Sequence, residues 1–415
     1  MTNDAILQYL RPLSSQDPNV VAEACSSIRC LGERDRLAHS DKLMAADLIL
    51  GAMRRNMEVN VAKEGCGALA ELSRTSNVKT KESLVASGTG DVVINALQTY
   101  SSNVQVVTNG CAVLVWLSWE TPRNQVAFMA AGASDAALQA MQTHQNKFVA
   151  GHGCGVLANL ADLRANKEAL TLAGAGDAVL RAMKAYKNDS YVALQACEAI
   201  GNLAHNVDSV AALMKAGAGA AVLDAMRSHP SDLKVAEFGS WALLNLLVST
   251  THHVALTADG AIDIVVNAMK LYSGNENVAW KGCGALYQLA KNADNKAALM
   301  TAHASYTIFN AIKFHPGNKE VCRWGGKALK ELEAPYEDII TQLVGVTPKN
   351  LTTGKREISS EGYGVCTICL DAFDDKTHVM TALNCGHCTC QDCANKLNSC
   401  HTCRQPITSR LRLYV

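Results

Sequence analysis

The chain repeats itself at a nearly constant interval along most of its length. With one small residue of each copy as a reference point, the successive intervals are 41, 45 and then 43 five times. A valine stands five places before every reference residue, and a leucine stands six places after it. The reference residues are Cys25, Cys66, Cys111, Cys154, Cys197, Ser240, Cys283 and Gly326. A unit of this length cannot bury an apolar face alone, so the pattern predicts copies stacked into a solenoid.

Each copy also has the spacing of amphipathic helices. In the fifth copy the apolar residues from Val192 to Leu203 follow one another by 4, 3, 1 and 3 places, which puts them on one stripe of a helix. A glycine-rich turn opens a second helix before it, as in residues 173–183 and 216–226, and a short first helix is expected over Asn166–Leu172. Such units resemble the armadillo/HEAT family, and the resemblance covers roughly residues 15–333.

The resemblance to armadillo proteins implies a binding groove. In that family the third helix of each unit lines a concave surface, and its asparagines hold an extended peptide. The position five places after the reference residue matches that role. The substrate-groove residues implied are Asn159, Asn202, Asn245 and Gln288 at this position, and Trp241, which stands four places before Asn245. Two alternatives stay open. The amides could only cap or solvate the helix face, or the Trp241–Asn245 spacing could reflect the nuclear-transport function of armadillo importins.

Eight potential zinc ligands lie close together near the end of the chain. Their spacing is C-x2-C-x15-C-x-H-x2-C-x2-C-x6-C-x2-C. The ligands are Cys366, Cys369, Cys385, His387, Cys390, Cys393, Cys400 and Cys403. Four such pairs fill two closed tetrahedral sites, which predicts two structural Zn²⁺ ions. The segment is too short for a large core, so the metals must supply much of its folding free energy. Chance cysteines or disulfides are the alternative reading.

This spacing resembles the RING domain, and the resemblance implies how the ligands divide. Cys366, Cys369, Cys390 and Cys393 would hold one zinc, and Cys385, His387, Cys400 and Cys403 the other. It also implies a RING-type E3 ubiquitin ligase, which orients a ubiquitin-loaded E2 enzyme and forms no covalent intermediate itself. Cys388 and His401 are spare potential ligands, so an exchange of one ligand stays open. His401 also stands where the family usually has proline.

The RING resemblance carries further roles onto single residues. The apolar contacts with the E2 enzyme fall on Ile368 and Leu397, and the basic residue that bridges E2 and ubiquitin falls on Arg404. Ordinary packing of a small domain is the alternative for the two apolar residues. A solvated surface arginine is the alternative for Arg404.

The last residues resemble the tail of the inhibitor-of-apoptosis type of dimeric RING ligase. The resemblance implies a homodimer formed through the RING and the tail, with Ile407 and Leu411 on the dimer side. It places Tyr414 against the ubiquitin-loaded E2 of the partner RING. A short strand, indicated by the alternation of Leu411, Leu413 and Val415, is the alternative reading.

Composition limits the remaining classes of function. Lys and Arg number 38 and Asp and Glu also number 38, which argues against a dedicated binder of nucleic acid or of anionic membranes. The first residues lack the pattern of a signal peptide, and no run of about 18 apolar residues predicts a membrane span. Sixteen cysteines in such a chain indicate a reducing compartment, the cytoplasm or the nucleus.

These patterns together predict an all-α armadillo/HEAT-type solenoid of about eight repeats and a small zinc-stabilised α+β RING domain. The predicted boundaries are 1–333 for the solenoid, 334–361 for a flexible linker and 362–415 for the RING with its tail. The expected function is an E3 ubiquitin ligase whose solenoid recruits an unidentified protein substrate. The alternative is a non-catalytic armadillo scaffold that uses the RING for dimerisation.

Overall fold

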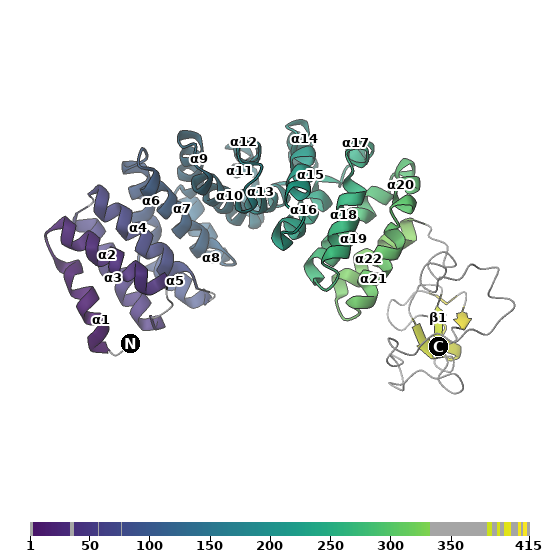
Figure 1. Ribbon diagram of the computed structural model, residues 1–415, viewed down its shortest axis with the longest axis horizontal. Coiled ribbons are helices and arrows are strands. Elements are labelled where there is room, and N and C mark those ends of the chain that lie inside the picture. Colours follow the sequence, from purple (N-terminus) through teal and green to yellow (C-terminus); the bar gives the residue numbers. More distant parts are fainter. Residues whose placement is uncertain are drawn as a thin grey trace.

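The computed structural model describes residues 3–33, 37–56, 58–75, 77–332, 380–383, 388–390, 394–399, 406–407 and 410–412. The part up to residue 332 is an arched stack of helices that follow one another in sequence order (Figure 1). Every repeat contributes one long helix that carries its reference residue. These third helices are α2 (Pro18–Glu33), α4 (Val59–Ser73), α7 (Val104–Ser118), α10 (Lys147–Asp162), α13 (Ser190–Leu203), α16 (Leu233–Leu246), α19 (Glu276–Ala290) and α22 (Lys319–Glu331).

Six repeats have two shorter helices before the third. The first helices are α5 (Val78–Ala86), α8 (Pro122–Ala130), α11 (Arg164–Leu172), α14 (Val207–Lys215), α17 (His253–Ala258) and α20 (Lys296–Thr301), the last two preceded by the 3-10 turns η2 (Thr250–His252) and η3 (Ala293–Asn295). The second helices are α6 (Thr89–Thr99), α9 (Ala133–Thr143), α12 (Ala175–Ala185), α15 (Ala218–Ser228), α18 (Ala261–Leu271) and α21 (Ala304–Phe314). The three-helix armadillo unit predicted from the sequence is therefore confirmed.

A left-handed residue makes the sharp bend between the first and second helices. α14 and α15 meet at 68°, and Gly217 between them has a φ of 91°. Glycine holds this position in five repeats because it lacks the Cβ atom that disfavours a positive φ. The glycines are Gly88, Gly132, Gly174, Gly217 and Gly260. In the last repeat His303 occupies the same position with a φ of 57°.

The start of the solenoid departs from the regular unit. It begins with α1 (Asn3–Leu10) and the 3-10 turn η1 (Arg11–Ser14), which precede α2 directly. Between α2 and α4 a single helix, α3 (His39–Arg55), replaces the usual first and second helices. Met44 of α3 stands nine places before Met53, where the later repeats have the left-handed glycine, and α3 continues through this position without a bend.

The reference residues lie where neighbouring third helices meet. All of them except Gly326 in the last helix are fully or almost fully buried. The glycine before many of them allows close approach of the second helix: a Cβ on Gly65 would lie 2.7 Å from the sulfur of Met53. Met53, Met183, Met226 and Met269 are buried in the same core, whereas Cys30 is exposed and Cys322 half-buried. Burial raises the pKa of the Cys66, Cys111, Cys154 and Cys197 thiols to about 12, so these cysteines stay neutral.

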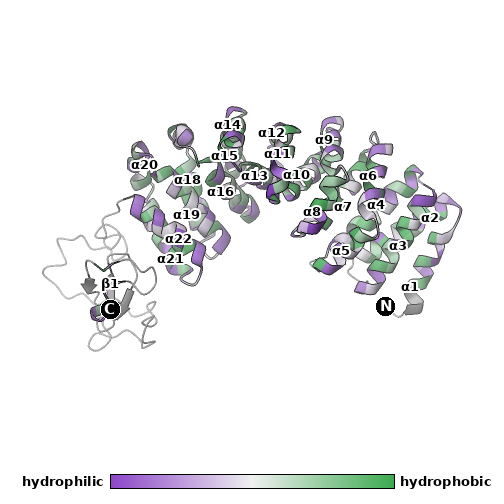
Figure 2. Ribbon diagram, turned by 180° about the vertical axis from the view of Figure 1, so that it is seen from behind, coloured by the Kyte–Doolittle hydropathy of each residue, from purple (hydrophilic) through white to green (hydrophobic). Residues whose placement is uncertain are grey.

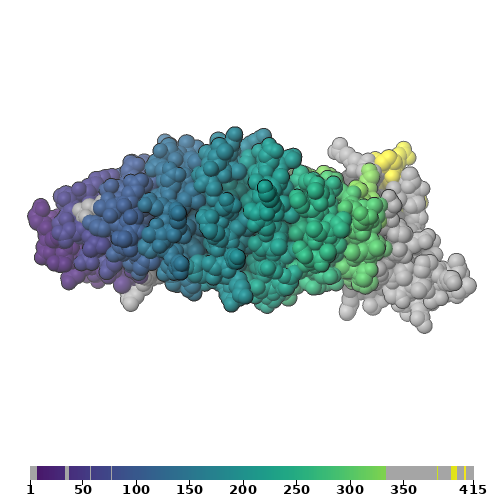
Figure 3. Space-filling model, turned by 90° about the horizontal axis from the view of Figure 1, so that it is seen from above, coloured from purple at the N-terminus to yellow at the C-terminus, as the bar shows by residue number. Residues whose placement is uncertain are grey.

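The apolar core extends through the stack instead of filling one centre. Figure 2 shows hydrophobic and hydrophilic residues mixed along every helix of the stack. Figure 3 shows that successive segments follow one another along the long axis of the solenoid, so each repeat packs mainly on its neighbours in sequence.

The residues that end the second helices alternate in type. Tyr100, Tyr186 and Tyr272 end α6, α12 and α18, and histidines end the helices between and after them. The Nε2–H groups of these histidines donate to the carbonyl that follows the tyrosine of the preceding repeat. The bonds are His144 to Ser101 at 2.7 Å, His229 to Lys187 at 3.1 Å and His315 to Ser273 at 2.8 Å. The second helices are thus joined in pairs.

The described C-terminal residues form a small antiparallel sheet. Its strands are β1 (Met380–Leu383), β2 (Cys388–Cys390) and β3 (Arg410–Arg412), in the order β2-β1-β3. Thr381 pairs with Thr389 on one side and with Arg412 on the other. Residues 394 and 395 are helical, and Ala394 is buried. The strands and the short helical segment agree with the predicted small α+β domain.

Within the described residues, no single helix is long and apolar enough to cross a bilayer. The bent pair α14 and α15 reaches the required length and composition when both helices are taken together.

Candidate functional site

Most of the predicted zinc and E2-binding residues lie outside the described part of the chain. Cys390 is the exception among the ligands, because it ends strand β2. The residues outside are Cys366, Ile368, Cys369, Cys385, His387, Cys393, Cys400, Cys403, Arg404 and Tyr414. The described residues alone bring together no group of three or more metal-binding side chains. The donor set of thiolates and one imidazole is nevertheless the one that zinc prefers.

Leu397, the second predicted E2 contact, lies in the described part of the C-terminal segment. It is half-buried, and its N–H donates to the carbonyl of Ala394 at 3.3 Å. The next residue, Asn398, accepts a backbone hydrogen bond from Ile407 at 3.0 Å, and Ser399 forms a β-bridge with Pro406. These pairings bring together the two ends of the segment that carries Cys400, Cys403 and Arg404.

The tail contributes a strand to the sheet of the same chain. Leu411 in β3 lies opposite Ala382 in β1. The short strand that the sequence offered as an alternative is therefore present over residues 410–412. The dimer roles of Ile407, Leu411 and Tyr414 stay predictions.

The amides predicted to line the groove have partners inside the solenoid. Each asparagine Nδ2 donates to a carbonyl in the preceding third helix. The bonds are Asn159 to Val115 at 2.9 Å, Asn202 to Ala158 at 3.1 Å and Asn245 to Gly201 at 2.9 Å. Asn159 and Asn202 are only 6% and 8% exposed. The ladder therefore joins successive third helices, and binding of a peptide by the same amides stays a prediction.

Trp241 belongs to this ladder through the preceding repeat. Its indole N–H donates to Oδ1 of Asn202 at 3.1 Å. Gly201 leaves room for the ring, because a Cβ there would come within 2.7 Å of the indole nitrogen. Trp241 thus pairs with the asparagine of the repeat before it, whereas the sequence suggested a pairing with Asn245.

Gln288, the last predicted groove residue, accepts a side-chain hydrogen bond, whereas the asparagines donate to carbonyls. It is buried, and its Oε1 accepts a hydrogen bond from the ammonium group of Lys291 at 3.1 Å. The same ammonium group lies 5.5 Å from the ring centre of Tyr287. The last amide of the predicted groove is therefore next to a cation.

A buried ion pair lies beside the ladder and was not predicted from the sequence. Glu237 on α16 and Lys281 on α19 are 4% and 8% exposed, and their charged atoms are 2.8 Å apart. Burial raises the pKa of Glu237, but Lys281 and then Lys234 outweigh it, so the pKa lies below its usual value. The ammonium of Lys281 also lies 5.0 Å from the ring centre of Phe238 and 5.5 Å from that of Trp280.

A second carboxylate near this pair has the opposite shift. Burial raises the pKa of Glu198 on α13 to about 7, and the attraction of Lys281 opposes that rise. Glu198 is therefore only partly charged at neutral pH, which reduces the negative charge around Lys281.

Aromatic rings and cations continue onto the last repeat. The ring centres of Tyr287 on α19 and Trp324 on α22 are 5.8 Å apart. The ammonium of Lys327 lies 5.0 Å from Trp324 and 5.7 Å from Tyr287, and the guanidinium of Arg323 lies 4.8 Å from Trp324. The sequence signal for this cluster was the recurrence of tryptophan and lysine within three places of the reference residues.

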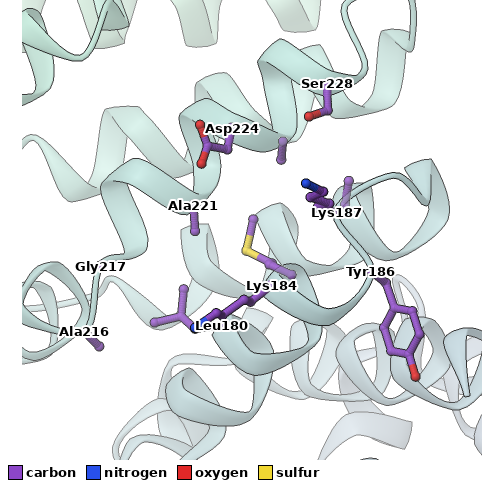
Figure 4. A pocket seen from close by; sticks show the side chains of 12 residues that line it. Leu180, Lys184, Tyr186, Lys187, Ala216, Gly217, Ala221, Asp224 and Ser228 are labelled. Carbon is purple, nitrogen blue, oxygen red and sulfur yellow. The ribbon is translucent and has the colours of Figure 1, made fainter. Parts of the chain in front are cut away.

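A depression of about 590 Å³ lies between α12 and α15 (Figure 4). Leu180 and Ala221 contribute apolar surface from the two helices, whereas Lys187 and Asp224 contribute charge from opposite walls. The lining contains no histidine or cysteine and a single carboxylate, so it lacks the ligands of a metal site.

Comparison with known proteins agrees with both parts of the fold. The family described as zinc finger, C3HC4 type (RING finger), matches residues 363–410. An engineered protein of known structure superposes with a TM-score of 0.64 at 18% identity, over 82% of this chain and 83% of its own. A designed armadillo repeat protein superposes with a TM-score of 0.50 at 19% identity, over 58% of this chain and 99% of its own. The chain therefore has an armadillo-type solenoid and a C3HC4 RING segment.

Curated relatives match over short stretches of this chain. The E3 ubiquitin-protein ligase RGLG3 of Arabidopsis thaliana is 48% identical over 50 residues, which are 12% of this chain and 12% of that protein. The E3 ubiquitin-protein ligase LRSAM1 of Mus musculus is 44% identical over 50 residues, 12% of this chain and 6% of that protein. The chain thus spans about an eighth or less of the length of these relatives.

Proposed function

We propose that this chain is a RING-type E3 ubiquitin ligase whose solenoid recruits the protein to be modified. The observation that carries the proposal is the RING match over residues 363–410, and two proteins named as E3 ubiquitin ligases are 44% and 48% identical to this chain over 50 residues each. The chemistry is attack of a substrate lysine on the thioester between E2 and ubiquitin. The ligase contributes orientation and loss of mobility, and no bond to its own side chains.

Two zinc ions are proposed to hold the RING in shape. Eight thiolate and imidazole donors suffice for two closed tetrahedral sites, so no position is left for a catalytic water. Zinc therefore supplies folding free energy here and takes no part in the transfer.

Three side chains of the RING are proposed to act on the loaded E2. Ile368 and Leu397 provide apolar contacts with the E2 enzyme, and Arg404 donates hydrogen bonds to E2 and ubiquitin together. A planar guanidinium suits that task because it offers several N–H donors in a fixed geometry. The half-buried state of Leu397 leaves part of its side chain for such a contact.

The tail is proposed to complete an active homodimer. Tyr414 would contact the ubiquitin-loaded E2 held by the partner RING. In support, β3 carries the chain through the RING sheet to residue 412, two residues before this tyrosine.

The solenoid is proposed as the substrate-binding part, with residues 334–361 as a flexible linker to the RING in a cytoplasmic or nuclear protein. The candidate groove runs along the third helices past Asn159, Asn202, Trp241, Asn245 and Gln288. Because the Nδ2 groups of the three asparagines already donate to carbonyls, a peptide would donate to the remaining lone pairs of the Oδ1 oxygens and would contact the neighbouring side chains.

The test is single-turnover discharge of ubiquitin from a loaded E2 to free lysine, catalysed by the full chain across a panel of E2 enzymes. We expect acceleration, and its loss in Arg404→Ala and Cys366→Ala. Arg164→Ala, on an exposed position of α11, is the matched control and should leave the rate unchanged. Full discharge by the Cys366→Ala variant would contradict the proposal.

A non-catalytic scaffold is the second candidate, favoured by His401 at a position where active RING domains usually have proline. It predicts a zinc-bound dimer that accelerates discharge from none of the E2 enzymes. Light scattering of the same samples would separate this outcome from a RING that has not folded.

A further inference from the structure

The third helices differ in charge between the two ends of the solenoid. The described third helices α2 and α4, with the residue that ends α4, carry four carboxylates and three cations. The helices α16, α19 and α22, with the residue that ends α19, carry seven cations and four carboxylates. The cations are Lys234, Lys281, Lys291, Lys319, Arg323, Lys327 and Lys330, and the carboxylates are Glu237, Glu276, Glu320 and Glu331. The third helices of the last three repeats therefore carry three more cations than carboxylates, although the whole chain is neutral.

The carboxylates nearest the aromatic cluster already have partners. Glu237 binds Lys281 at 2.8 Å and Lys234 at 3.0 Å. Glu320 accepts from Arg323 at 3.1 Å and from the indole N–H of Trp324 at 3.1 Å. Lys291 and Lys327 are exposed, and neither has a carboxylate partner in the described part of the chain.

Aromatic rings hold these two lysines in place. Both ammonium groups lie near Tyr287, at 5.5 Å for Lys291 and 5.7 Å for Lys327, and Lys327 also lies 5.0 Å from Trp324. Attraction between the cations and the rings limits the motion of the side chains, so less conformational entropy is lost when an anion binds. The four residues Tyr287, Lys291, Trp324 and Lys327 are called the cationic surface below.

We propose that the cationic surface binds an acidic peptide segment, rich in aspartate or glutamate, of the protein that the solenoid recruits. The proposal rests on the substrate-recruiting function proposed above and specifies the chemistry of that substrate. Carboxylates of the peptide pair with Lys291 and Lys327. The buried amide of Gln288 lies beside Lys291 on the same helix.

Charge and ring geometry favour this occupant over two others. A lysine-rich peptide would meet like charges at both lysines. A nucleic acid would stack bases on the rings, but the guanidinium of Arg323 and the ammonium of Lys327 already lie against Trp324, at 4.8 Å and 5.0 Å. A carboxylate binds the outer side of the cations and leaves these contacts intact.

The test measures binding of three fluorescein-labelled probes to the full chain by fluorescence anisotropy. They are a short peptide of alternating glutamate and serine, the same peptide with glutamine for glutamate, and a thymidine oligonucleotide of matched length. We expect the acidic peptide to bind, and its affinity to fall at higher ionic strength. The double variant Lys291→Glu/Lys327→Glu should weaken binding by about tenfold or more.

The control is a double charge reversal elsewhere on the solenoid, Lys79→Glu/Lys215→Glu, on exposed positions of the first helices α5 and α14. It should leave the affinity within about twofold, because screening weakens charges this distant from the site. Circular dichroism of both variants checks that the helices are retained.

Three results would overturn the proposal: no binding of the acidic peptide, equal binding of the glutamine peptide, or an equal loss in the control variant. Tight binding of the oligonucleotide alone would assign the surface to nucleic acid instead. The discharge assay tests the ligase separately. Peptide binding without discharge would contradict the ligase and keep the acidic partner, and the reverse result would contradict the acidic partner alone.

Discussion

A single backbone position distinguishes the last repeat from the five before it. His303 adopts the left-handed conformation that glycine adopts elsewhere. We expect His303→Gly to stabilise the solenoid by up to about 1 kcal/mol, because the strain at a positive φ is removed. The reverse change, Gly217→Ala, should destabilise by about 1 kcal/mol. A Cβ on Gly217 meets no atom within 4 Å, so the effect isolates the backbone.

Urea denaturation followed by circular dichroism measures both changes. Ala221→Gly, inside α15, serves as the control, since glycine there should destabilise the helix by up to about 1 kcal/mol. Equal stability of the wild type and the His303→Gly and Gly217→Ala variants would show that the bend does not depend on the left-handed residue.

The raised pKa of Glu198 makes stability depend on pH. Between about pH 4.5 and 7 the unfolded chain loses this proton while the folded chain keeps it, so stability falls as pH rises through that window. We expect Glu198→Gln to be more stable than wild type at pH 8, by about 1–3 kcal/mol, and similar to it at pH 4.

Denaturation midpoints of both proteins across this pH range test the prediction. Exposed Glu168→Gln provides the comparison and should follow the wild-type curve. A stabilisation that stayed constant with pH would mean that burial of the charge is not the cause.

Residue-level predictions from the sequence succeeded where one periodic position sets the environment. The buried cysteines such as Cys154 follow from the repeat alone. The pair of Glu237 and Lys281 could not be found in this way, because the two residues occupy different positions within two successive repeats. Only the packing of α16 against α19 brings the two side chains together.

At the scale of elements, the amide ladder should be a source of stability. Asn202→Ala removes the donor to Ala158 and leaves the indole N–H of Trp241 without its acceptor. We expect a loss of about 1–3 kcal/mol, the usual cost of unpaired buried polar groups. Thermal unfolding measures it, with Gln142→Ala on an exposed position of α9 as the control. Unchanged stability would indicate that the amides are available to bind a peptide.

Helix positions were predictable to within a few residues where the repeat is regular. The first helix expected over Asn166–Leu172 is α11, which begins two residues earlier at Arg164. Leu163 ends the preceding helix in an extended conformation with a ψ of 118°, and the new helix starts directly after it. Such a boundary depends on the backbone conformation of one residue, which side-chain periodicity does not reveal. The uninterrupted α3 was missed for the same reason.

At the scale of the whole molecule, the two parts should respond separately to loss of metal. Removal of zinc by a chelator is expected to abolish ubiquitin discharge, because the RING loses most of its folding free energy. The solenoid should keep its helical circular dichroism and its unfolding temperature, since no group of three or more metal-binding side chains occurs among its described residues. Restoring zinc should restore discharge, and a loss of helix content on chelation would contradict this separation.

The division into two parts was predictable because each has its own sequence period. The solenoid repeats about every 43 residues, and the zinc ligands recur in close pairs. The roles of Arg404 and Tyr414 rest on resemblance, because both lie outside the described residues. No periodic signal in the sequence specifies them.

The alternation of tyrosine and histidine at the ends of the second helices bears on how the chain could gain or lose length. Removing one repeat would place two tyrosines or two histidines in succession and would interrupt the regular pairing that the bond from His229 to Lys187 illustrates. Removing two adjacent repeats would leave two of the three bridges and keep the alternation. Duplication or deletion of an even number of repeats therefore preserves the alternation of tyrosine and histidine, whereas an odd number interrupts it.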